Sequence, residues 1–272
     1  MNSLASDFRA AGLPLELRSL PLSLDAWAQA SAIVQMDIAA GSLKRSLARR
    51  DMVTNRERYR IYPGHETNVL EVMDVDDTTH QLVLRVDEPV RSMGLARDQL
   101  GPTPPDDDEI RTITTSGFAR HFLLGMDESH LFIAQLPRLA MTVARARAAL
   151  RPAALDALER DAPKPTLRQG EWFFVPLAEP EEQRIELLAR RSYRVLRKVG
   201  IAEAAGIHRI GRPHVAEELV LVPDPVTAVR ATYVRGAVVH PDHRTIVLRT
   251  WHQVVPNTER LEVPVPGVEW YD

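Results

Sequence analysis

Three of the nine histidines in the chain lie in one segment, VVHPDHRTIVLRTWHQVV, which runs from Val238 to Val255. Imidazole is the commonest metal ligand and the usual proton carrier near neutral pH, so this segment is the first candidate for a site. Pro241 and Asp242 suit a two-residue turn, because proline fixes φ and aspartate hydrogen-bonds locally. Residue i then pairs with residue 483 − i, which places His240 opposite His243.

The third histidine of the segment, His252, follows His243 by nine residues on the second strand. At ~3.3 Å per residue, it lies roughly 30 Å from the turn. Side chains alternate between the faces of a strand, so it also lies on the other face. In a straight hairpin the three histidines therefore do not form one site.

A catalytic zinc site needs a third protein ligand beside His240 and His243. The segment RPHVAEEL supplies His214, Glu217 and Glu218, and His214 shares a face with Glu218 on either a strand or a helix. We therefore predict a divalent metal such as zinc on His214, His240 and His243, with His240, His243 and Glu218 as candidate catalytic residues. The alternative, which we favour at this point, is a solvent-facing turn without chemistry.

A second candidate is Glu171 in the segment RQGEWFF. A carboxylate among aromatic side chains can have a raised pKa. The alternative, which we favour, is a strand in which Glu171 and Phe173 point away from Trp172 and Phe174.

A third candidate is the basic stretch 188–214, which contains a single acid, Glu203. Arginines with an aromatic side chain can hold phosphates and stack a base. The alternative is a solvated face balanced by the acids at 179–186. The candidate binding residues are Arg190, Arg191, Tyr193, Arg194, Arg197, Lys198, Arg209 and Arg212.

Composition excludes several classes of protein. The chain has 272 residues, is 44% hydrophobic and 26% charged, has a net charge of −3 and contains no cysteine. Thiolate nucleophiles, disulfides, iron–sulfur clusters and cysteine zinc sites are excluded. The motifs GxGxxG, GxxxxGK[ST], HExxH and GxSxG are absent. With no long apolar run and no signal-peptide pattern, we expect a cytoplasmic protein without membrane contact.

The elements that must position these candidates give an α+β fold with an N-terminal helical segment and antiparallel hairpins in two lobes. We predict an N-terminal lobe at 1–160, a linker at 161–167 and a β-rich C-terminal lobe at 168–272. The composition of 100–109 predicts a surface loop, and 184–199 is compatible with helix or strand. The main predicted elements are a helix at 23–50 and strands at 68–75, 81–86, 118–124, 130–136, 217–222, 227–239 and 244–255.

The segments RQGEWFFVP and VRGAVVHPDHRTIVLRTWHQVVPNTE, with HFLLGMDESHLFIAQLP before them, resemble segments of uncharacterised bacterial proteins labelled hypothetical. The resemblance covers most of 59–260, and implies that both lobes belong to one recurring gene product. It implies no activity and no site residue.

Two hypotheses about function follow. The first is a binding module whose arginine-rich C-terminal lobe contacts nucleic acid or an acidic protein partner. The second is a metal-dependent hydrolase or nuclease-like enzyme with a histidine and carboxylate site. The absence of common catalytic motifs favours the binding module.

Overall fold

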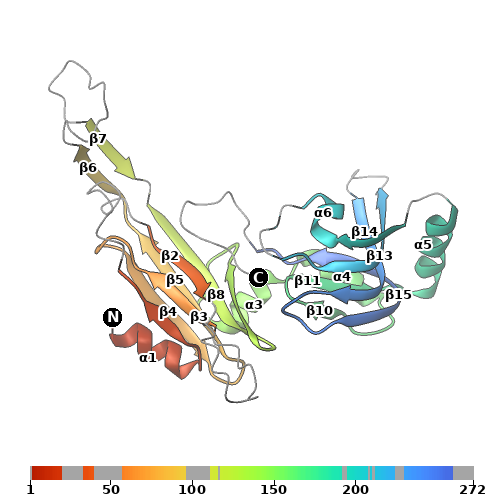
Figure 1. Ribbon diagram of the computed structural model, residues 1–272, viewed down its shortest axis with the longest axis horizontal. Coiled ribbons are helices and arrows are strands. Elements are labelled where there is room, and N and C mark those ends of the chain that lie inside the picture. Colours follow the sequence, from red (N-terminus) through yellow and green to blue (C-terminus); the bar gives the residue numbers. More distant parts are fainter. Residues whose placement is uncertain are drawn as a thin grey trace, which may run out of the picture. The chain divides into compact units, whose positions relative to one another are not determined.

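The computed structural model describes residues 2–19, 33–39, 57–95, 111–115, 117–191, 195–207, 209, 212–223 and 230–259. They form two compact units (Figure 1). Of the described residues, the first takes those within Met1–Met126 and Ile133–Ala146, and the second takes those within Asp127–Phe132 and Arg147–Leu261. The fold is α+β, as predicted. Among the described residues, no helix is both long and apolar enough to cross a membrane.

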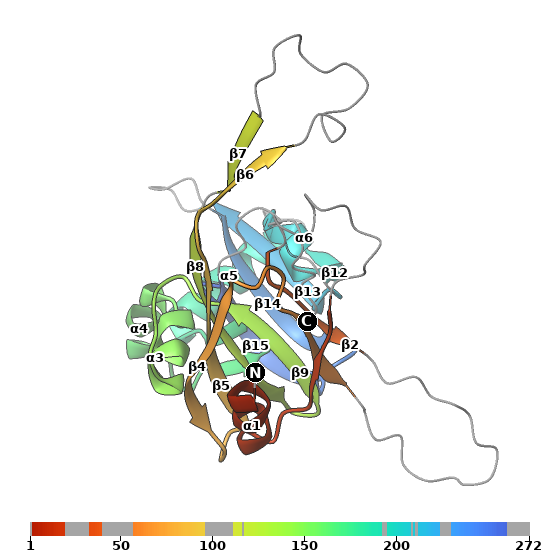
Figure 2. The same ribbon diagram turned by 90° about the vertical axis from the view of Figure 1, so that its left-hand side faces the viewer.

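The first unit is built on two sheets, ordered β1-β3-β2 and β4-β5-β8-β9, and on a ribbon of β6 and β7. Helix α1 packs beside β4 (Figure 2). The unit and its boundary contain α1 (Asn2–Ala10), β1 (Leu15–Leu17), β2 (Gln35–Ala39), β3 (Arg58–Tyr62), β4 (Val69–Asp76), β5 (Gln81–Glu88), β6 (Arg91–Leu95), β7 (Arg111–Thr115), β8 (Phe118–Asp127), β9 (His130–Gln135) and α3 (Val143–Leu150).

The two predicted hairpins of this unit are confirmed as β4–β5 and β8–β9. In the first hairpin the Thr79 amide donates to Asp76 Oδ1 at 3.1 Å, and this bond closes the turn. Between the two hairpins, β5 pairs with β8 over its whole length. Leu82 and Phe122 are buried there and form part of the core.

The predicted helix at 23–50 is wrong at Gln35–Ala39, which forms β2. Val34 and Met36 are buried two residues apart, the period of a strand, and β2 pairs with β3. The local apolar pattern fitted a helix, but pairing with a strand distant in sequence decides the structure. The rest of 23–50, apart from Ile33 and Val34, lies outside the described residues, as does 100–109.

The second unit is one antiparallel sheet of six strands, ordered β10-β11-β15-β14-β13-β12. The stretch 184–199 falls into both helix and strand. The elements are α4 (Ala153–Arg160), β10 (Leu167–Gln169), β11 (Trp172–Pro176), α5 (Glu179–Arg191), β12 (Leu196–Gly200), α6 (Ile201–Ala205), β13 (Val215–Pro223), β14 (Arg230–Val239) and β15 (Ile246–Pro256).

Helices cover both faces of this sheet. Phe173 packs in one cluster with Leu155 of α4, whereas its neighbour Phe174 packs in another cluster with Ile201 of α6. Successive strand residues point to opposite faces, so α4 and α6 lie on opposite sides. Every residue of β11 is therefore buried, which explains its continuous apolar sequence.

The units divide between Ala146 and Arg147. The segment 161–167, predicted as a linker, lies inside the second unit, between α4 and β10.

Candidate metal site

The connection between β14 and β15 is longer than the predicted two-residue turn. Val238 pairs with Ile246, so residue i pairs with 484 − i near the turn, and the loop covers 240–245. The Asp242 amide donates to His240 Nδ1 at 3.2 Å, which satisfies a backbone group outside the strand ladder. A turn at Pro241 and Asp242 alone is therefore wrong, and both histidines lie within the loop.

Strand register brings the third histidine to this loop. Val215 at the start of β13 pairs with Val239 at the end of β14, so the residues just beyond them, His214 and His240, meet. Their rings stack with centroids 4.2 Å apart and planes at 16°. The His243 ring lies 5.4 Å from that of His214 and 4.8 Å from that of His240. One nitrogen from each histidine lies within 4.8 Å of the others.

A glycine borders the cluster. Gly170 lies in the turn between β10 and β11 with φ of +55°, a conformation that glycine adopts without strain. A Cβ atom there would lie 2.9 Å from His243 Nε2 and 3.2 Å from His214 Nε2. Both ring nitrogens therefore face Gly170 so closely that a larger residue there would displace the rings.

The hydrogen bonds of His214 and His240 differ. His240 Nε2 lies 3.0 Å from the Arg212 carbonyl oxygen, which only accepts, so this nitrogen carries the proton and Nδ1 accepts from Asp242. His214 Nδ1 lies 3.4 Å from Glu171 Oε1. Both ring nitrogens of His214 are buried and have no hydrogen-bond partner within the described part of the chain, so the contact with Glu171 is an ion-pair distance without hydrogen-bond geometry.

Burial sets the charges of the cluster. Burial and the neighbouring His214 ring lower the pKa of His240 to about 4. Burial also lowers the pKa of His243, against the opposing charge of Asp127. Both rings are therefore neutral at neutral pH, the form that binds metals.

Glu171 behaves in the opposite way. Burial raises the pKa of its carboxyl, but the contact with His214 and the charge of Arg209 outweigh that effect and lower it. The carboxylate is therefore ionised at neutral pH. Of the two alternatives that the sequence allowed, the carboxyl with a raised pKa does not apply.

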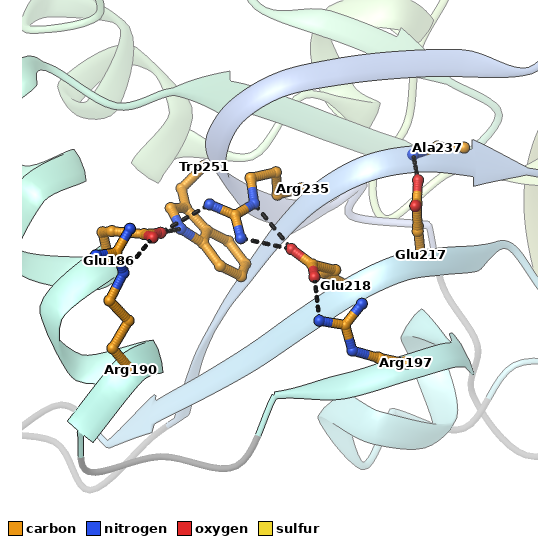
Figure 3. A network of polar contacts seen from close by, with 8 residues as sticks. All are labelled: Glu186, Arg190, Arg197, Glu217, Glu218, Arg235, Ala237 and Trp251. Atoms are coloured by element: carbon orange, nitrogen blue, oxygen red, sulfur yellow. Dashed lines mark hydrogen bonds and ion pairs between the residues drawn. The ribbon is translucent and has the colours of Figure 1, made fainter.

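The structure places Glu217 and Glu218 in other contacts (Figure 3). Glu218 Oε2 accepts from Arg235 Nη2 at 2.6 Å, and Glu217 Oε2 accepts from the Ala237 amide at 2.8 Å. A β-bulge between Ala216 and Glu218 interrupts the alternation that gave His214 and Glu218 a common face. Among the residues that the structure describes, the close group of metal-ligand atoms comes from the three histidines alone.

The predicted arginine cluster is largely paired with acids. Arg191 and Lys198 are exposed, whereas Tyr193, Arg194 and the neighbouring His208 lie outside the described residues. The ion pairs are Arg190 with Glu186, Arg197 with Glu218, Arg209 with Glu259, and Arg212 with Asp242. Acids therefore neutralise much of the positive charge that the sequence places there.

Two contributors to the site were not predicted. Gly170 and the ionised state of Glu171 depend on the close approach of two loops, and the only local signal is a glycine at the start of a strand pattern. His252 lies in β15 opposite Val234, outside the cluster.

Comparisons of the chain with protein-family models, with curated proteins and with solved structures found no match.

Proposed function

We propose that the second unit binds a divalent transition metal, zinc in first place, through His214, His240 and His243. The observation that carries the proposal is the approach of one nitrogen from each ring to within 4.8 Å of the others. With Zn–N bonds of about 2.0–2.1 Å, tetrahedral ligand nitrogens lie about 3.4 Å apart. The rings must close by on the order of 1 Å, a side-chain movement.

Binding also requires a rotation. A metal lies in the plane of each imidazole that binds it, and the stacked rings of His214 and His240 are 16° from parallel. His240 must turn and release the Asp242 amide, and His243, whose ring is 23° from parallel with that of His214, must turn as well. That hydrogen bond contributes about 1 kcal/mol, whereas structural zinc contributes about 10–16 kcal/mol in zinc-finger peptides. The exchange therefore favours the bound form.

Three protein ligands leave one position for water or substrate, the pattern of catalytic zinc sites. A zinc ion held by the three histidines would lower the pKa of a bound water to about 7 and so supply hydroxide for hydrolysis. The enzymatic form of the proposal is therefore a metal-dependent hydrolase or nuclease-like enzyme.

We rank this proposal above the binding module that the sequence favoured. Polyanion binding needs cations that are free to contact phosphates, and the acids beside Arg190, Arg197, Arg209 and Arg212 compete for them. That hypothesis keeps its own test: Arg194→Glu with Arg197→Glu should reduce retention on heparin.

Metal analysis and melting curves test the proposal. We expect stoichiometric zinc in protein purified without a histidine tag, and a melting temperature that falls in EDTA. His240→Asn with His243→Asn deletes two ligands, so its melting should be lower and insensitive to EDTA.

The matched control is His65→Asn with His80→Asn, which replaces two histidines in the first unit. It should keep the response to EDTA. A wild type that melts identically with zinc and with EDTA would contradict the proposal.

A further inference from the structure

We infer that Glu171 is the positioning residue of this site: it orients His214 so that the ion binds at His214 Nε2, the nitrogen that faces Gly170. The inference rests on the metal-binding function proposed above.

The contact between Glu171 and His214 selects the nitrogen. Glu171 Oε1 lies 3.4 Å from His214 Nδ1, and both side chains are almost fully buried. A carboxylate accepts hydrogen bonds and does not donate them, so it favours the tautomer with the proton on Nδ1. The lone pair then lies on Nε2. Neither ring nitrogen has a hydrogen-bond partner among the described residues, and Nδ1 is the nitrogen that lies beside the carboxylate. This is the carboxylate–histidine–metal arrangement of many metal sites.

The backbone holds Glu171 in place. Its carbonyl oxygen accepts the Asn257 amide at 2.8 Å, directly beyond the pairing of Trp172 with Pro256. Gly170 makes the preceding turn in the left-handed region. The sheet therefore fixes the backbone of Glu171 before any ion binds, and a fixed backbone is one condition for a rigid site.

The second ligand faces Gly170 as well. A Cβ atom at this position would lie 2.9 Å from His243 Nε2 and 3.2 Å from His214 Nε2, so both Nε2 atoms point toward the same residue. The His243 ring is only half-buried, whereas His214 is 2% exposed. An ion therefore reaches the buried ring from the side of His243.

Nuclear magnetic resonance tests the binding atom in the unaltered chain. Long-range proton–nitrogen spectra of the zinc-loaded protein should show His214 protonated at Nδ1 and bound to metal at Nε2. Binding at Nδ1, or a proton on Nε2, would overturn the inference while leaving the proposed function intact.

The variant Glu171→Gln keeps the shape of the side chain and removes its charge. We expect Zn²⁺ affinity, measured by titration calorimetry, to fall about 10- to 100-fold, as for other outer-shell ligands. The matched control is Glu128→Gln, since the charge of Glu128 also acts on His243. An equal loss in both variants would indicate a general effect of charge and overturn the positioning role.

A methyl group added at Gly170 tests whether the two Nε2 atoms need a glycine beside them. Gly170→Ala should weaken Zn²⁺ and Co²⁺ binding at least tenfold, because its Cβ meets the two Nε2 atoms. Gly206→Ala is the matched control: its φ of +72° imposes similar strain, and a Cβ atom there meets nothing within 4 Å. Both variants are checked for folding by circular dichroism.

The outcomes separate the two claims. If the wild type binds neither Zn²⁺ nor Co²⁺, the proposed function fails. If it binds both ions, and Glu171→Gln and Gly170→Ala bind them as their controls do, this inference alone fails.

Discussion

At the scale of single residues, Glu88 and Arg120 form the most deeply buried ion pair of the first unit's described residues. Their side chains are 1% and 6% exposed, and Arg120 Nη2 donates to Glu88 Oε2 at 2.8 Å. Glu88 Oε1 also accepts the Val34 amide at 2.6 Å. Glu88→Gln leaves the guanidinium charge uncompensated in the core. We expect a loss of about 3–5 kcal/mol in the free energy of unfolding, measured with urea.

The same substitution at Glu71 is the control. Glu71 lies 3.8 Å from Arg85, and its side chain is 55% exposed. Exposed pairs contribute about 0–1 kcal/mol, so Glu71→Gln should change stability very little. Comparable losses in the two variants would show that burial is not the deciding factor.

Sequence reasoning named the three clustered histidines because few residue types bind metals and the chain has few histidines. It did not place Glu218, because a bulge beside Glu217 and the competing charge of Arg235 are not visible locally. The role of Glu171 was missed for a similar reason: its charge state depends on His214, 43 residues away in sequence (214 − 171).

At the scale of elements, Arg235 joins a helix and three strands (Figure 3). Its guanidinium on β14 donates to Glu186 of α5 and to Glu218 of β13. It also lies 4.5 Å from the ring centroid of Trp251 on β15. The Trp251 Nε1–H donates to the same Glu186 oxygen at 2.8 Å. This network attaches α5 to the sheet.

The variant Arg235→Lys keeps the charge and loses the planar fork that serves both carboxylates. We expect the free energy of unfolding to fall by about 1–2 kcal/mol. This value allows for solvent screening, because the side chain is one-third exposed. Urea unfolding followed by tryptophan fluorescence measures the loss. Arg230→Lys, at the exposed start of β14, is the control and should change stability by no more than about 0.5 kcal/mol.

The strands around this network were predicted well. Segments 217–222, 227–239 and 244–255 contain β-branched residues at strand spacing, and β13, β14 and β15 lie there. The helix predicted at 23–50 failed at β2 because an apolar pattern does not reveal its pairing partner. Local sequence therefore identified strands with strong patterns of their own, whereas β2 depended on β3.

At the scale of the whole molecule, proline and charge at 161–167 predicted a boundary, whereas the compact units divide between Ala146 and Arg147. Proline and charge indicate that 161–167 is a turn with little buried surface. They do not show which strands pair with the segments on either side of it. The short excursion Asp127–Phe132 belongs to the second unit although its neighbours on both sides belong to the first. Grouping of this kind depends on contacts between distant residues.

Acid should destabilise both units, because each buries a histidine that folds in the neutral form. Burial lowers the pKa of His121 in the first unit and of His252 in the second. Hydrogen bonds to the carbonyl oxygens of Ala140 and Thr250 oppose the shift without cancelling it. In the unfolded chain both histidines titrate near a pKa of about 6.5.

The unfolded chain therefore binds more protons than the folded protein once the pH falls below about 6.5. The contribution of neutral His121 and His252 to stability is complete above that pH and is lost as the pH falls toward their lower folded-state pKa values. We expect the free energy of unfolding, measured with urea between about pH 8 and pH 5, to decrease toward acid. His121→Asn with His252→Asn removes both titrations, so its stability should be lower at neutral pH and should depend less on pH. A wild type whose stability stays constant or rises over this window would show that neither histidine needs to be neutral in the fold.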